Sequence, residues 1–209
     1  MYAGDVIAET RLRFADEFQR RTDDGNPPGL EELLNLPEKE DLKKHDQIET
    51  ANNVEKVKYE QEYERIPVYG TVITAAEDLE TGKHTDDVTG VVYKGIEDDV
   101  KSTKPNISKK EALNIAKEHH QHRDTAEANA ILKIYEHKDK AHLVYMVTHL
   151  AVGDNDELTA PTTVIDANKA DVLDTWETFT TVKTKHLKGK ECLISVMKAG
   201  SSHYNNLLC

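Results

Sequence analysis

Histidines carry the most obvious chemistry in this chain, because imidazole can bind metals or transfer protons near neutral pH. The densest group is His119-His120-x-His122. A zinc hydrolase needs His-Glu-x-x-His, with two imidazoles one helical turn apart and a glutamate as general base, and the sequence contains no such stretch. Adjacent helical residues point about 100° apart. We therefore predict no metal site here and assign the group to a helix end, where cationic side chains are favoured.

Other residue types that support catalysis also lack the required spacing. The sequence has no Gly-x-Ser-x-Gly, Walker loop or glycine-rich dinucleotide turn. Its two cysteines, Cys192 and Cys209, lie near the end of the sequence without zinc-ligand spacing. A disulfide between them and a pair of free thiols both stay open. We predict no catalytic residues and no enzymatic activity.

Composition limits the possible partners. The 209 residues are 37% apolar and 32% charged, with 39 acidic side chains against 27 basic ones and a net charge of −12. This balance argues against binding to a nucleic-acid backbone, which requires clustered Lys and Arg. No apolar run approaches the roughly 20 residues of a membrane helix, and the first residues lack the apolar core of a secretory signal. We expect either a cytoplasmic protein or one whose signal has been removed.

Alternation of side chains predicts the first strands. Val57, Tyr59, Gln61 and Tyr63 share one face of an extended segment, and the charged residues between them share the other. Pro67 and Gly70 then predict a turn. The apolar pair Val72 and Ile73 can return along the first strand. We therefore expect an antiparallel hairpin over residues 57–74.

The sequence around this hairpin contains weaker signals. We predict an amphipathic helix over Glu9–Arg21 and a short leucine-rich helix before Pro37, whereas residues 38–53 fit a helix or a loop. Residues 77–83 form a turn-rich connection to a strand predicted over residues 89–96. Gly90 and Gly95 mark bends or bulges in that strand. Residues 101–106 contain a proline and predict a boundary between two modules.

The clearest helix start in the sequence follows this boundary. Ser108 and Glu111 have the spacing of a capping box, and the helix is expected to end near residues 119–123. Strands are predicted over residues 130–136, 141–151, 162–166 and 172–175, before a basic tail of uncertain structure. The expected fold class is α+β, with two small modules that each have an antiparallel sheet packed with one or more helices.

Two motifs resemble known families. The first is Tyr59-x-Gln61-x-Tyr63-x-x-Ile66-Pro67-Val68-Tyr69-Gly70, which resembles the fungalysin/thermolysin propeptide module. In that family glycine usually stands where this chain has Arg65. The second motif is Ile165-Asp166-Ala167-x-x-Ala170-x-Val172-Leu173, which resembles the last hairpin of a PepSY domain, with Ala170 where glycine is usual. Modules in this order resemble the propeptide of a thermolysin-like zinc metalloprotease.

The resemblance implies domain limits and a function. It implies a propeptide module over residues 1–103, a PepSY-like domain over 104–181 and a basic tail over 182–209. It further implies an intramolecular chaperone and inhibitor that is secreted or periplasmic, with a thermolysin-like catalytic domain as its partner. Zinc and calcium are expected in that protease, and no cofactor is expected in this chain. No nucleic acid or membrane partner is expected.

The resemblance also implies contact residues near the C-terminal end of the chain. Such propeptides run through the protease cleft and are cut before a bulky apolar residue, so we predict a junction at His186-Leu187, with His186 left near zinc. Trp176 either closes the core of the second module or contacts the protease. The alternative function is a free-standing PepSY-type protease-binding or regulatory protein. A histidine-rich metal-binding protein is the third hypothesis.

Overall fold

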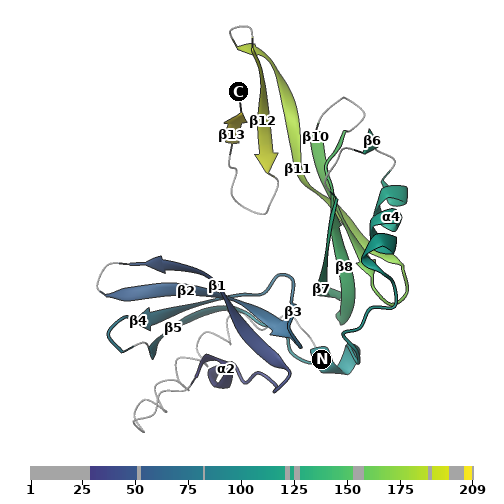
Figure 1. Ribbon diagram of the computed structural model, residues 1–209. Helices are drawn as coiled ribbons and strands as arrows, with labels where there is room; N and C mark the ends of the chain where they lie inside the picture. Colours follow the sequence, from purple (N-terminus) through teal and green to yellow (C-terminus); the bar gives the residue numbers. More distant parts are fainter. Residues whose placement is uncertain are drawn as a thin grey trace. The chain divides into compact units, whose positions relative to one another are not determined.

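Figure 1 shows a computed structural model of the chain, with its helices and strands labelled in sequence order. It describes residues 29–50, 53–81, 83–120, 123–124, 128–152, 158–187, 190–197 and 205–208. The chain divides into two compact units, which we call the first unit (residues 1–103 with 134–142) and the second unit (residues 104–133 with 143–209). Each contains an antiparallel sheet and at least one helix. The predicted α+β fold class is therefore confirmed.

Among the described residues, the first unit holds a five-stranded sheet in the order β1-β2-β4-β5, with β3 paired to β2. Its strands are β1 (Glu40–Glu49), β2 (Val54–Tyr63), β3 (Ile66–Pro67), β4 (Val72–Asp78) and β5 (Lys83–Val91). Every strand pair in this sheet is antiparallel. The predicted hairpin is confirmed, because Tyr59 of β2 lies opposite Ile73 of β4.

One face of this sheet carries the core of the first unit. Helix α2 (Leu30–Leu33) packs its leucines there, as the leucine spacing predicts. The buried members of this core are Leu30, Leu33, Leu34, Leu42, Ile73, Ala75, Val88 and Val92. Tyr59 and Leu36 pack against them. The helix predicted over Glu9–Arg21 lies outside the described residues.

Two predictions about the first unit were wrong. Residues 38–53 fit a helix or a loop in the sequence, but Glu40–Glu49 is a strand along the edge of the sheet. Its polar sequence has little strand propensity of its own, and pairing with β2 determines its structure. The strand predicted over residues 89–96 begins earlier, at Lys83, and ends at Val91. Gly95 has φ 79°, and a short helix, α3 (Ile96–Asp99), follows it.

The second unit contains helix α4 (Lys109–His119) and a sheet with eight strands among its described residues. The strands are β6 (Arg123–Asp124), β7 (Asn129–His137), β8 (Lys140–Thr148), β9 (Ala151–Val152), β10 (Leu158–Asp166), β11 (Val172–Leu187), β12 (Lys190–Met197) and β13 (Asn205–Leu208). The predicted cap is confirmed, because the Ser108 hydroxyl accepts a hydrogen bond from the Glu111 backbone N–H at 3.2 Å. Part of β7 and β8 belongs to the first unit.

The C-terminal strands differ from the tail of uncertain structure that the sequence predicts. The sheet order is β13-β12-β11-β10-β8-β7, so residues 182–187, 190–197 and 205–208 extend the sheet of the second unit. Strand β11 continues to Leu187, which lies opposite Lys190 of β12. Local periodicity fades in this region, but backbone hydrogen bonds between strands need no side-chain period. In the described part of the chain, no helix has the length and apolar character needed to span a bilayer.

Candidate functional site

The residues of the first motif lie together in the first unit. Tyr59, Gln61 and Tyr63 follow one another along one face of β2, and Ile66 and Pro67 form β3 beside the end of that strand. Tyr63 lies opposite Ile66. The chain reverses through two residues, Glu64 and Arg65, with φ values of 47° and 69°. Two left-handed residues between paired strands are typical of a tight hairpin turn.

Gln61 is the most enclosed polar residue of this motif, with 0% of its surface exposed. Its side-chain carbonyl accepts a hydrogen bond from the Tyr93 backbone N–H at 2.9 Å, and its amide nitrogen donates to the Tyr93 carbonyl at 2.8 Å. The same nitrogen donates to Oε2 of Glu40. Gln61 therefore connects β1, β2 and the segment after β5. We call Gln61, Glu40 and Tyr93 the Gln61 network.

The backbone of Gln61 fixes the turn that follows the hairpin. Its carbonyl accepts a hydrogen bond from the Val68 N–H at 2.8 Å. Its N–H donates to the Thr71 hydroxyl at 3.2 Å, and that hydroxyl donates to the Val68 carbonyl at 2.8 Å. Gly70 has φ 85° within this turn, a conformation that favours glycine. The motif thus forms a closed hydrogen-bonded turn with Val68 buried inside it.

Glu40 brings a carboxyl group into this buried network. The residue is 5% exposed. Burial raises the pKa of its carboxyl group, and the nearby charge of Glu97 raises it further, whereas the Gln61 hydrogen bond and Lys94 lower it. Sequence reasoning missed Glu40, because only the pairing of β1 with β2 places it opposite Tyr63.

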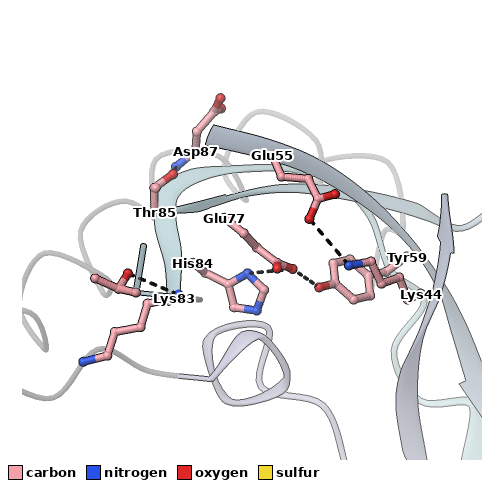
Figure 2. Close-up of polar contacts among 9 residues, drawn as sticks. Lys44, Glu55, Tyr59, Glu77, Lys83, His84, Thr85 and Asp87 are labelled. Atoms are coloured by element: carbon pink, nitrogen blue, oxygen red, sulfur yellow. Dashed lines mark hydrogen bonds and ion pairs between the residues drawn. The ribbon is translucent and has the colours of Figure 1, made fainter. Parts of the chain in front are cut away.

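Figure 2 shows a second polar cluster, at the end of the same sheet face. The Tyr59 hydroxyl donates a hydrogen bond to Oε1 of Glu77, and Nδ1 of His84 lies 3.7 Å from the same oxygen. The rings of Tyr59 and His84 meet edge to face at 6.1 Å. Lys44 lies 3.8 Å from the Glu55 carboxylate. Burial and Glu77 raise the pKa of Tyr59 well above its usual value.

The hairpin turn is also attached to the end of the first unit. The Tyr63 hydroxyl donates to the Val100 carbonyl at 3.2 Å. The Glu64 carboxylate accepts a hydrogen bond from Thr103 at 2.8 Å and lies 3.1 Å from the Lys39 ammonium. These contacts, Thr103 first, lower the pKa of Glu64. The motif therefore connects Lys39, before β1, with Val100 and Thr103, which follow α3.

The second motif forms a turn in the second unit. One oxygen of Asp166, a buried residue, accepts hydrogen bonds from the backbone N–H groups of Asn168 and Lys169 at 2.8 and 3.0 Å. Ala170 has φ 66° and donates its N–H to the Asp166 carbonyl. The backbone of Ala170 is thus left-handed, a conformation that favours glycine. Asp166 supports this turn by accepting its backbone hydrogen bonds.

The residues predicted to contact a partner belong to the second unit. Trp176 is a partly exposed residue of β11 and lies opposite Thr162. His186 and Leu187 are at the end of the same strand. The side chains of His186 and Leu187 are outside the described part of the structure. A partner contact by any of these three residues stays a prediction.

The histidine group lies at the end of α4. Nε2 of His120 is 2.6 Å from the Thr163 hydroxyl, and the His120 ring contacts those of His119 and His149. His122 lies outside the described residues, as do the side chains of Cys192 and Cys209. Within the described ranges, no three His, Cys, Asp or Glu residues are arranged to hold a metal ion. The described geometry thus gives His120 a hydroxyl partner within the fold.

These sites and this fold define a two-unit α+β protein, and comparison with known proteins relates part of it to proteases. The chain is 31% identical over 140 residues to a virulence metalloprotease of Vibrio anguillarum. It is 30% identical over 144 residues to a neutral protease of Vibrio proteolyticus, and 28% over 148 residues to a zinc metalloproteinase of Legionella pneumophila. These matches cover 62%, 65% and 67% of the chain, respectively.

The matches cover much less of the relatives, at 22%, 23% and 27% of their lengths. The chain therefore spans about a quarter of each of these metalloproteases. No family model matches the chain. Among solved structures, the C-terminal domain of YpeB from Bacillus megaterium aligns with 78% of the chain and 64% of that domain, at 13% identity. The TM-score of this alignment is 0.33.

Proposed function

We propose that this chain is the propeptide of a thermolysin-like zinc metalloprotease and acts as its intramolecular chaperone and inhibitor. The observation that carries the proposal is the similarity of about two thirds of the chain to about a quarter of several metalloproteases. The sequence contains no His-Glu-x-x-His motif, which a zinc protease of this type needs for its ligands and general base. The region of similarity therefore fits a part of the protease that performs no catalysis.

The physical role of such a chain follows from binding linkage. A chain that binds the folded protease and not its unfolded form stabilises the folded state by mass action. The same binding blocks catalysis if the contact covers the active-site cleft. Zinc and calcium belong to the protease in this proposal. A secreted or periplasmic location follows from the same proposal.

The finer proposal concerns β11. Its end carries His186 and Leu187, and the chain reverses before Lys190. An extended backbone is the form in which peptides bind in clefts by strand addition. We place the cleavage junction between His186 and Leu187 and a contact with the protease at Trp176. The two-unit organisation supports assigning a propeptide module to the first unit and a PepSY-like domain to the second.

Inhibition of the mature Vibrio proteolyticus neutral protease tests this function directly. The complete 209-residue chain is added to the protease, hydrolysis of a short fluorogenic peptide is followed, and mass spectrometry locates any cleavage of the chain. Slow, tight inhibition with cleavage before Leu187 is the expected result. Rapid degradation of the chain without inhibition, together with no gain in the refolding yield of denatured protease, would overturn the proposal.

Matched variants separate a specific junction from a general loss of binding. Leu187→Asp should abolish cleavage at the junction, because a charged residue replaces the bulky apolar one. Leu79→Asp is the control, since Leu79 is 46% exposed in the first unit, and it should behave like the unchanged chain. Inhibition without any effect on protease refolding would favour a free-standing regulator over a chaperone.

A further inference from the structure

The Gln61 network contains a carboxyl group that the fold leaves partly unsatisfied. Oε2 of Glu40 accepts a hydrogen bond from Gln61. Oε1 is buried and has no hydrogen-bond partner among the described residues. An ionised carboxylate offers about four acceptor positions. The ionised form of Glu40 is therefore poorly solvated by its surroundings.

The described neighbours of Glu40 compensate for this only in part. The amide nitrogen of Gln61 has two protons, and its partners are Glu40 and the Tyr93 carbonyl. The charges that act on the carboxyl are Lys94, after β5, and Glu97, in α3, and they have opposite signs. Tyr63, the residue opposite Glu40, donates its hydroxyl to the Val100 carbonyl instead. The single hydrogen bond from Gln61 and the opposed charges of Lys94 and Glu97 therefore offset only part of the cost of burying a negative charge at Glu40.

We propose that Glu40 is a pH-sensitive switch in the first unit, whose ionisation as the pH rises weakens the Gln61 network. Burial raises the pKa of this carboxyl. Because the folded state favours the protonated acid, the stabilisation is complete below the ordinary pKa of Glu and is lost as the pH rises through the raised value. The contribution of Glu40 to the stability of the first unit is therefore larger at low pH than at high pH.

The switch gives a consequence that rests on the proposed function. A propeptide whose first unit is destabilised as the pH rises would bind its protease more tightly at lower pH and release it more readily at higher pH. A chain that acts as both chaperone and inhibitor must leave the protease before the mature enzyme can work. Glu40 would thus link removal of the propeptide to the pH of the compartment.

Urea unfolding of the full chain tests the switch itself. The midpoint is measured between about pH 5 and about pH 8 for the unchanged chain and for Glu40→Gln, which keeps the shape of the side chain and an acceptor for Gln61. We expect the midpoint of the unchanged chain to fall as the pH rises, and the midpoint of the variant to fall less and to be higher at the upper pH. Glu38→Gln, at an exposed position two residues earlier, should follow the unchanged chain.

Equal pH dependence in the unchanged chain and Glu40→Gln would overturn the switch. If the variant does not fold, the carbon NMR signal of the Glu40 carboxyl in the unchanged chain decides. Titration above the ordinary value for Glu supports the switch, and titration at or below it overturns the switch. Both measurements are independent of any protease.

Inhibition of the Vibrio proteolyticus neutral protease at the same pH values tests the consequence. The ratio of inhibition by Glu40→Gln to inhibition by the unchanged chain cancels the pH dependence of the protease. This ratio should rise with pH. A constant ratio, with the unfolding difference present, would overturn the role of the switch in release. Absence of inhibition by either chain at every pH would overturn the proposed function and leave the unfolding result unaffected.

Discussion

The side-chain amide of Gln61 pairs with the backbone of Tyr93 in both directions, donating to its carbonyl and accepting from its N–H. The Gln61 side chain thereby makes the two backbone hydrogen bonds to Tyr93 that a neighbouring strand would otherwise make. Gln61 is fully buried in this pairing, and Tyr93 is partly buried. The fold therefore requires a residue that offers both a donor and an acceptor at this position.

Replacing Gln61 with Leu should destabilise the chain severely. The variant leaves two backbone groups of Tyr93 and the carboxyl of Glu40 without their partner, and each unsatisfied buried group costs about 1–3 kcal/mol. We expect a loss of roughly 3 kcal/mol or more in the free energy of unfolding, measured with urea. Gln47→Leu is the control, since Gln47 is exposed on β1. A comparable loss in both variants would contradict this role of Gln61.

Replacing Tyr59 with Phe should remove the hydrogen bond to Glu77 that Figure 2 shows. Loss of one such bond to a charged group costs about 1.5–3 kcal/mol, which urea unfolding would detect. Because the pKa of Tyr59 is raised, folding resists ionisation of the phenol, and the stability from this group is lost as the pH rises through the raised value. Ultraviolet titration should therefore show a late-ionising tyrosine that Tyr59→Phe eliminates.

Glu77→Gln tests whether the negative charge of Glu77 contributes to the raised pKa of Tyr59. The variant keeps an acceptor for the Tyr59 hydroxyl and removes the negative charge, so the tyrosine should ionise earlier while the chain stays folded. Unchanged ultraviolet titration in Glu77→Gln would mean that burial and the hydrogen bond, and not the negative charge of Glu77, raise the pKa of Tyr59. Burial is the largest cause, with the hydrogen bond to Glu77 next.

The sequence predicts those parts of the fold that local pattern determines. Alternation along β2 and the cap at Ser108 are local signals, and both predictions are confirmed. Strand β1 has no such signal, since its polar residues become a strand only through pairing with β2. The long strand β11 likewise depends on its neighbours β10 and β12.

The residues of the candidate site also divide into those that local sequence pattern indicates and those that only the fold brings together. Gln61 stands out in the sequence because it is a polar residue on the apolar face of a predicted strand. Its partners Glu40 and Tyr93 are separated from it by 21 and 32 residues in sequence. Only the register of β1 with β2 and the path after β5 bring them together. A contact of this kind has no local period and cannot be read from residue spacing.

Replacing Arg65 with Gly should stabilise the hairpin turn. Arg65 has φ 69°, a conformation that costs a residue with a Cβ atom roughly 1–2 kcal/mol, of which the greater freedom of unfolded glycine cancels part. We expect a net gain of roughly 0.5–1 kcal/mol in the free energy of unfolding. Arg65→Ala removes the same side chain but keeps Cβ, so it should give no gain. Equal gains in both variants would show that the added stability comes from removing the arginine side chain, and not from relieving the left-handed backbone.

Replacing Gly90 with Ala should separate β4 from β5. Gly90 has φ 152°, and a Cβ atom there would lie 2.3 Å from the Val72 carbonyl oxygen and 2.7 Å from the Ile73 Cα. Both contacts are with backbone, so a strand must move, and we expect a loss of roughly 3 kcal/mol in urea unfolding.

Gly70→Ala is the control for Gly90→Ala. Gly70 has φ 85°, but a Cβ atom there would meet nothing within 4 Å, so its expected loss is only about 1 kcal/mol from backbone strain. The difference between the two variants measures the close approach of β4 and β5. Similar losses at both positions would mean that φ alone requires glycine at Gly90, and that the contact with Val72 is relieved at little cost.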